Sequence, residues 1–119
     1  MSKRILVVED NKDSRELLSK LLELEGYSVL TARDGREGLA AVASERPDLI
    51  ITDVSMPDVN GLAMIRTVRE TSHSSDLPIV ALTAYTSLRE KAIETGANRA
   101  MAKPFNYESF LVHISELLA

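Results

Sequence analysis

Short, continuously apolar runs recur along the chain and are separated by longer stretches with a helical repeat. Three of these runs, at residues 5–8, 49–51 and 79–82, contain no polar residue. Strands of a parallel sheet that are covered on both faces carry such runs, whereas half-exposed strands alternate between apolar and polar residues. The three runs therefore predict central strands. Weaker runs at 27–32 and 99–102 predict two flanking strands, the second with low β propensity because Ala100 and Ala102 lie in it.

The stretches that follow these runs have apolar residues at helical spacing and recognisable helix ends. The first covers about 12–25 and ends at Gly26, and the fourth ends at Gly96. The expected N-terminal residues are Asn11, Asp34, Asn60, a capping box running from Ser87 to Glu90, and Asn106. The side chains expected to face the sheet are Leu17, Leu18, Leu21 and Leu22; Leu39, Val42 and Ala43; Met64, Ile65 and Val68; and Phe110, Leu111, Ile114, Leu117 and Leu118.

Strand and helix patterns alternate five times, which predicts an α/β fold. Parallel neighbouring strands need helical crossovers, and these are right-handed in nearly all proteins. We therefore expect one domain over residues 1–119, a (βα)5 doubly wound five-stranded parallel sheet with the flavodoxin-like strand order 2-1-3-4-5. Ligands of such sheets bind beyond the carboxyl ends of the strands.

Composition narrows the functional classes. The longest apolar runs are far shorter than the roughly 20 residues of a membrane span, and the run at 5–8 is too short for the core of a signal peptide. Together with the absence of cysteine, this predicts a cytoplasmic protein without membrane association. A net charge of −4 gives no general attraction to nucleic acid, so we expect no direct nucleic-acid binding.

Polar residues stand where the predicted strands end. They are Glu9, Asp10, Asp53, Thr83 and Lys103, and each one alone is compatible with an ordinary turn residue. Gathered at one edge, however, two carboxylates about 4 Å apart repel each other by roughly 4 kcal/mol, so the group needs a compensating cation. Mg²⁺ and Lys103 can supply it, because carboxylate oxygens without Cys or His suit a hard cation.

Five motifs in order along the chain resemble those of the receiver domains of two-component response regulators. They are Val7-Val8-Glu9-Asp10-Asn11, Ile51 to Pro57 with Asn60-Gly61, Ala81-Leu82-Thr83-Ala84, Gly96-Ala97 and Lys103-Pro104-Phe105. Any one of them is weak, but five at the family's spacing over nearly the whole chain form a specific signal. The resemblance implies that residues 1–119 form a single receiver domain that acts as a phospho-acceptor switch in a two-component or phosphorelay system.

The resemblance also implies a role for each site residue. Asp53 matches the phosphorylated carboxylate, Asp10 a direct Mg²⁺ ligand, Glu9 an acid that reaches the metal through water, and Ser55 a ligand through its backbone carbonyl. Lys103 and Thr83 match residues that bind phosphoryl oxygens, and a cis Lys103–Pro104 bond is expected to aim the lysine.

The implied phosphoryl donor is a histidine kinase or a histidine phosphotransfer protein, and the implied output is an unknown downstream protein. We expect no enzyme in the usual sense, only self-catalysed phosphoryl acceptance and autodephosphorylation. Ala100 departs from the pattern, because many receivers have Tyr or Phe there as a rotameric switch. This departure predicts a response rerouted towards the loop at 83–88, where Tyr85 lies.

Three other functions are alternatives to a phospho-acceptor switch. An FMN module would need a glycine-rich phosphate loop after the first strand, where Glu9 and Asp10 stand instead. A phosphatase with an aspartyl intermediate commonly has a second acid two residues after the nucleophile, where this chain has Ser55. The alternative kept open is a protein-docking module of the same fold that works without phosphorylation.

Overall fold

A five-stranded parallel sheet in the order β2-β1-β3-β4-β5 forms the centre of the molecule, as predicted. The computed structural model describes residues 2–55 and 61–119. The strands are β1 (Arg4–Val8), β2 (Ser28–Ala32), β3 (Leu49–Asp53), β4 (Ile79–Thr83) and β5 (Arg99–Ala102). The low-propensity run at 99–102 is thus a strand, paired along β4 from Val80–Arg99 to Thr83–Ala102.

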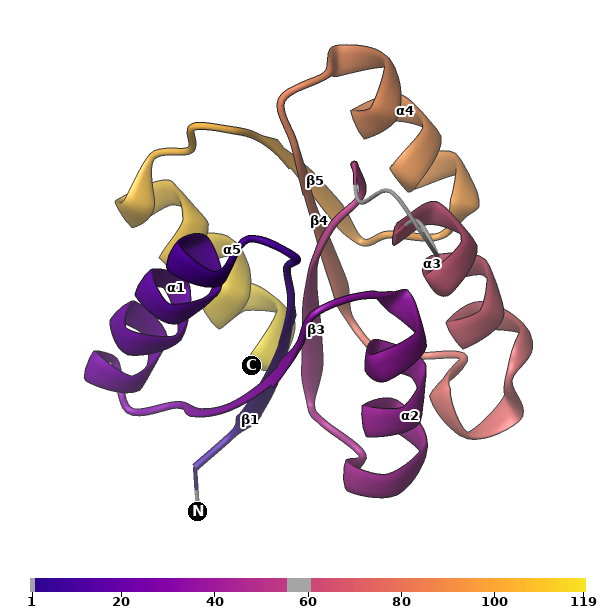
Figure 1. The fold of residues 1–119 in the computed structure, drawn as a ribbon, viewed down its shortest axis with the longest axis horizontal. Coiled ribbons are helices and arrows are strands. Elements are labelled where there is room, and N and C mark those ends of the chain that lie inside the picture. The colour runs from indigo at the N-terminus through magenta and orange to yellow at the C-terminus, as the bar shows by residue number, and fades with distance from the viewer. Residues whose placement is uncertain (1, 56–60) are drawn as a thin grey trace.

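Helices cover both faces of this sheet. They are α1 (Lys12–Leu24), α2 (Gly35–Glu45), α3 (Gly61–Glu70), α4 (Thr86–Thr95) and α5 (Tyr107–Leu118), with a 3₁₀ turn at Ser72–Ser74. Helices α1 and α5 lie on one face and α2, α3 and α4 on the other (Figure 1). Each parallel strand therefore needs apolar side chains on both of its faces, which is why the central strands have no polar alternation. Within residues 2–55 and 61–119, no helix has the length and apolar character to cross a membrane.

The two faces have separate hydrophobic cores. Alternate residues of one strand point to opposite faces, so Ile5 and Val7 pack with α1 and α5 while Leu6 and Val8 pack with α2 and α3. The predicted inward side chains Leu18, Leu22, Val42, Met64, Ile65, Val68, Phe110 and Ile114 are buried in these cores. Three of the predicted caps are confirmed, because the side chains of Asn11, Asp34 and Asn106 each accept a hydrogen bond from a backbone N–H in the first turn of the helix that follows.

Two side chains predicted to face the sheet do not. Leu17 is 60% exposed, and Ala43 is exposed while Ala41 packs partly buried against the core. The buried face of α1 and of α2 is narrower than the sequence indicated. Leu18 and Leu22 fill the contact of α1 with the sheet, and Leu39 and Val42 fill that of α2.

The predicted start of α4 is also wrong. The helix begins at Thr86 with Tyr85 in the N-cap position, and no side chain caps it, so Ser87 lies inside the first turn rather than before it. Hydrogen bonds from the N–H groups of Leu88 and Arg89 to the Tyr85 carbonyl replace the capping box. The expected cap of α3, Asn60, lies outside the described residues.

Candidate functional site

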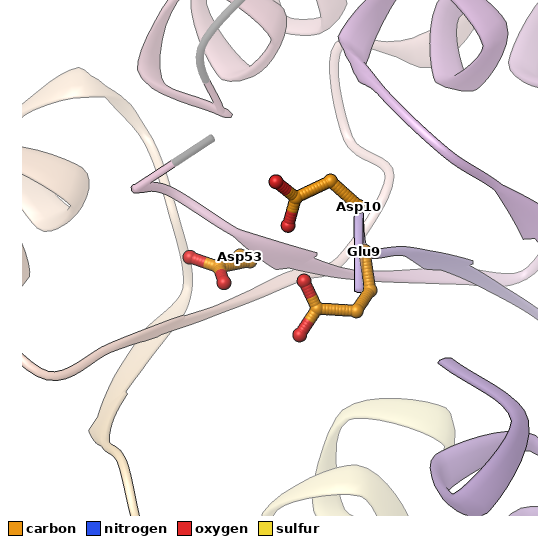
Figure 2. A group of neighbouring side chains, drawn as sticks. All are labelled: Glu9, Asp10 and Asp53. Atoms are coloured by element: carbon orange, nitrogen blue, oxygen red, sulfur yellow. The ribbon is translucent and has the colours of Figure 1, made fainter. Parts of the chain in front are cut away.

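Four strands deliver polar residues to the carboxyl edge of the sheet, where the sequence places them. Glu9 and Asp10 follow β1, Asp53 ends β3, Thr83 ends β4, and Lys103 follows β5. Figure 2 shows the side chains of Glu9, Asp10 and Asp53 converging on one space. One carboxylate oxygen from each of these three residues lies within 4.8 Å of the others. The strand order therefore brings together residues that are far apart in the sequence.

Lys103 joins two of these carboxylates. Its ammonium donates to Glu9 Oε1 at 2.9 Å and to Asp53 Oδ2 at 2.7 Å. The Lys103–Pro104 bond is cis, as predicted, and the Lys103 backbone N–H donates to the carbonyl of Thr83 at 2.9 Å. Burial lowers the pKa of Lys103, but its hydrogen bonds and ion pairs with Asp53 and Glu9 outweigh this and hold the pKa above its usual value. The lysine is therefore a permanent positive charge in the site.

Asp53 is the most fully hydrogen-bonded carboxylate of the group. Its Oδ1 accepts from the backbone N–H of Ser55 at 2.8 Å and from the Ser55 hydroxyl at 2.7 Å, while Oδ2 accepts from Lys103. Burial raises the pKa of Asp53, but the hydrogen bonds from Lys103 and Ser55 together lower it below its usual value. At neutral pH Asp53 is therefore an ionised, oriented carboxylate that is only 8% exposed.

Glu9 responds differently to the same surroundings. Burial raises its pKa above the usual value, and Lys103 opposes that rise without cancelling it. The charge of Asp53 and a side-chain hydrogen bond with Asp10 add to the rise, because a like charge disfavours ionisation. An additional cation near Glu9 would oppose this rise and favour the ionised carboxylate.

Thr83 ends β4, the strand that pairs with β3 and so lies beside Asp53. The pairing of Asp53 with Leu82 puts Thr83 one residue beyond that register, and its side chain is buried. The Thr83 hydroxyl accepts a hydrogen bond from the backbone N–H of Tyr85 at 3.2 Å, so it is linked to the residue that precedes α4. The hydroxyl is therefore in direct contact with the backbone that begins α4.

The donor set fits a magnesium ion. Mg²⁺ prefers oxygen ligands, uses one or two carboxylates and keeps several waters, and the three clustered acids supply oxygens alone. Asp10 is exposed while Glu9 and Asp53 are buried, so the cluster opens to solvent on one side. Water has access to the cluster from that side.

Two contributions to the site were missed by reasoning from the sequence. The Ser55 hydroxyl bonds Asp53 directly, whereas only its backbone carbonyl had been given a role. Arg15, in the second turn of α1, donates from Nη1 to the carbonyl of Glu9 at 2.9 Å and to that of Asp10 at 3.5 Å. A basic residue shortly after an acidic pair is too common a pattern to have indicated this contact.

The chain is similar to curated response regulators. It is 44% identical over 120 residues to the response regulator MprA of Mycolicibacterium vanbaalenii and to that of Mycobacterium tuberculosis. Each alignment covers 99% of this chain and 51% of the relative, so the chain spans about half the length of the curated relatives it matches.

Solved structures agree over nearly their full length. The chemotaxis response regulator CheY4 of Vibrio cholerae has a TM-score of 0.91 at 36% identity, covering 99% of this chain and 100% of that one. The response regulator TrrA of Thermotoga maritima, solved in complex with Mg²⁺-BeF, has a TM-score of 0.89 at 37% identity, covering 98% and 99%. The sequence profile of the response regulator receiver domain matches residues 5–115. The chain therefore belongs to the response regulator receiver domain family.

Proposed function

We propose that this receiver domain accepts a phosphoryl group on Asp53 in a Mg²⁺-dependent reaction and changes its partner-binding surface in response. The observation that carries the proposal is the placement of Lys103, whose ammonium bonds Asp53 and Glu9 at 2.7 and 2.9 Å inside a cluster of three acids. A lysine bonded to an oriented carboxylate that also belongs to a cluster suited to a divalent cation forms a site for a trianionic transition state.

Each residue has a distinct part in this reaction. A carboxylate oxygen of Asp53 attacks phosphorus, a P–O bond forms while the P–N bond of a phosphohistidine donor breaks, and the electron pair remains on the imidazole. Lys103 stays ionised and neutralises charge on the phosphoryl oxygens, while Glu9, Asp10 and Asp53, with the carbonyl of Ser55, would hold Mg²⁺. Mg²⁺ held by these residues would supply positive charge that offsets the negative charge of the acceptor and of the phosphoryl group.

The buried hydroxyl of Thr83 is suited to report the new group. The Thr83 hydroxyl accepts a hydrogen bond from the N–H of Tyr85. A phosphoryl oxygen on Asp53 would be a charged acceptor for the hydroxyl proton, and charged acceptors form stronger hydrogen bonds than neutral ones. A rotation of Thr83 towards the phosphoryl group would then disturb the uncapped start of α4. The new negative charge on Asp53 would thus alter the surface at the start of α4, as phosphorylation does in other switch proteins.

The donor in this proposal is a histidine kinase or a histidine phosphotransfer protein, and the acceptor of the signal is a downstream protein. Membership in the receiver family and the similarity to MprA, which is named a response regulator, support this assignment. Turnover is limited to self-catalysed phosphoryl acceptance and hydrolysis, because the chain offers Ser55 rather than a second acid two residues after Asp53.

The test is the intact mass of the protein after incubation with a small phosphodonor. Wild type should gain one phosphoryl group with Mg²⁺ and none with EDTA, and Asp53→Asn should gain none. Asp76→Asn, an exposed aspartate in the loop before β4, should behave as wild type. A wild-type protein that gains nothing with Mg²⁺ and a fresh donor would instead favour a docking module that works without phosphorylation.

A further inference from the structure

Arg15 is tied to the backbone that carries the acidic pair. Its Nη1 donates to the carbonyls of Glu9 and Asp10 at 2.9 and 3.5 Å, and the side chain is half-buried against them. The backbone of Arg15 is itself held in α1, because its N–H donates to Asn11 and its carbonyl accepts from Ser19. The guanidinium therefore links a rigid helix to the turn after β1.

This turn has few other restraints at Asp10. The Glu9 N–H donates to the carbonyl of Ala32, and Glu9 Oε1 accepts from Lys103, so Glu9 is held on two sides. Within residues 2–55 and 61–119, no N–H group donates to the exposed carboxylate of Asp10, whose side-chain partner is the carboxyl group of Glu9. The direction of the Asp10 side chain therefore follows from the conformation of the Glu9–Asp10 turn, which Arg15 contacts through both carbonyls.

If Arg15 acts through its charge, its substitution should change the Mg²⁺ affinity in the opposite direction from that expected if Arg15 positions a ligand. A fixed positive charge beside a cation site weakens cation binding, so removing the charge alone would strengthen it. Substitution of a residue that orients a metal ligand has the opposite effect and weakens metal affinity, typically by about 10-fold to 100-fold. The sign of the effect therefore separates the two roles.

We propose that Arg15 is a positioning residue for the Mg²⁺ site, holding the Glu9–Asp10 turn so that Asp10 points into the carboxylate cluster. The proposal rests on the Mg²⁺ dependence proposed above. It adds an element of the site that lies on α1 rather than at a strand end.

The test is isothermal titration of folded protein with Mg²⁺ alone. Arg15→Gln should bind Mg²⁺ about tenfold more weakly than wild type, although it has lost a positive charge. Arg15→Lys keeps the charge and can reach one carbonyl, so it should recover part of the affinity. Arg33→Gln is the matched control, because Arg33 follows β2 and pairs with Glu37 while its side chain is 72% exposed. This control should bind as wild type or slightly more tightly.

Two other results would overturn the proposal. If Arg15→Gln bound Mg²⁺ as tightly as wild type, or more tightly in step with Arg33→Gln, Arg15 would act as a nearby charge and position nothing. If wild type itself bound no Mg²⁺, the metal dependence and this inference would fall together. Urea unfolding in EDTA establishes that each variant is folded at the titration temperature, so a change in affinity is not a loss of structure.

Discussion

Replacing Lys103 by methionine removes the cation that the acidic cluster depends on in the absence of metal. Methionine keeps much of the length and apolar stem of lysine but carries no charge. Asp53 and Glu9 would then lose their contacts of 2.7 and 2.9 Å and face each other and Asp10 without compensation. We expect the metal-free variant to fold but to be less stable than wild type at neutral pH.

The size of the effect follows from burial. Removing one partner of a fully buried ion pair costs about 3–5 kcal/mol. The side chain of Lys103 is 30% exposed, while those of Glu9 and Asp53 are 7% and 10% exposed, so solvent screens part of the interaction. We therefore expect a loss of about 2 kcal/mol in the free energy of unfolding, or roughly 8 °C in the melting temperature of a domain this size.

The effect should depend on pH with a defined sign. In wild type the lowered pKa of Asp53 stabilises the folded state at neutral pH, and this contribution is lost as the pH falls through the folded pKa, below the unfolded value of about 3.9. In the Lys103→Met protein Asp53 keeps its hydrogen bonds from Ser55 but loses the one from Lys103, so its pKa is lowered less than in wild type. Glu9 loses the contacts that oppose the effect of burial, so its folded pKa lies further above the unfolded value than in wild type. The penalty on ionised Glu9 is present at neutral pH and is lost as the pH falls through that raised pKa. The difference in stability should therefore shrink between pH 7 and about pH 4.

Urea unfolding in EDTA, followed by circular dichroism at several pH values, measures this difference. Lys20→Met, a substitution of an exposed lysine on α1, is the control and should differ from wild type by less than about 0.5 kcal/mol. The reasoning is refuted if Lys103→Met is as stable as wild type at pH 7, or if its deficit grows on acidification.

Three further predictions concern metal binding, the acceptor strand and the response. The affinity for Mg²⁺ should fall as the pH falls through the raised pKa of Glu9, because a protonated carboxyl is a poor metal ligand. If the affinity measured by Mg²⁺ titration were the same at pH 5 and pH 7, Glu9 would take no part in binding. Gly61→Ala should lower the free energy of unfolding by about 1–3 kcal/mol and slow phosphorylation, because the added Cβ would lie 2.5 Å from the carbonyl oxygen of Asp53. Gly38→Ala is the control and should cost less, because its Cβ would meet the flexible side chain of Met64. Equal losses of stability in the two variants would count against this explanation. A beryllium fluoride phosphate mimic should shift amide resonances at 83–88 more than those of β5, since Ala100 has no rotamer to select, and equal shifts would contradict the rerouting.

The fold could be predicted from the sequence because its signals are redundant. The apolar runs of β1, β3 and β4 lie on both faces of the sheet, and the caps at Asn11, Asp34 and Asn106 agree with the helical repeats that follow them. The start of α4 could not be predicted in the same way. Ser87 and Glu90 match a capping box with Ser87 as the N-cap, but the N-cap in the structure is Tyr85, two residues earlier.

Side-chain contacts between segments that are far apart in the sequence could not be predicted from sequence patterns. His113 on α5 is half-buried, and its Nδ1 accepts from Arg99 Nε at 3.2 Å. Arg69 donates to the carbonyls of Ser75, Leu77 and Gly96 and so joins α3 to the end of α4. Neither residue belongs to a motif, because each is defined by what the fold brings next to it. The strand-end residues of the candidate site were predictable since topology alone brings them together.

Mapping the phosphorylated residue tests the central claim most directly. An acyl phosphate on aspartate is reduced by borohydride to homoserine, so the modified position can be read from the peptide masses. We predict that protein treated with Mg²⁺ and a phosphodonor yields homoserine at position 53, and that the conversion is lost in EDTA. Homoserine at Asp10, at another aspartate, or equally in the presence of EDTA would contradict the assignment of Asp53 as the Mg²⁺-dependent acceptor.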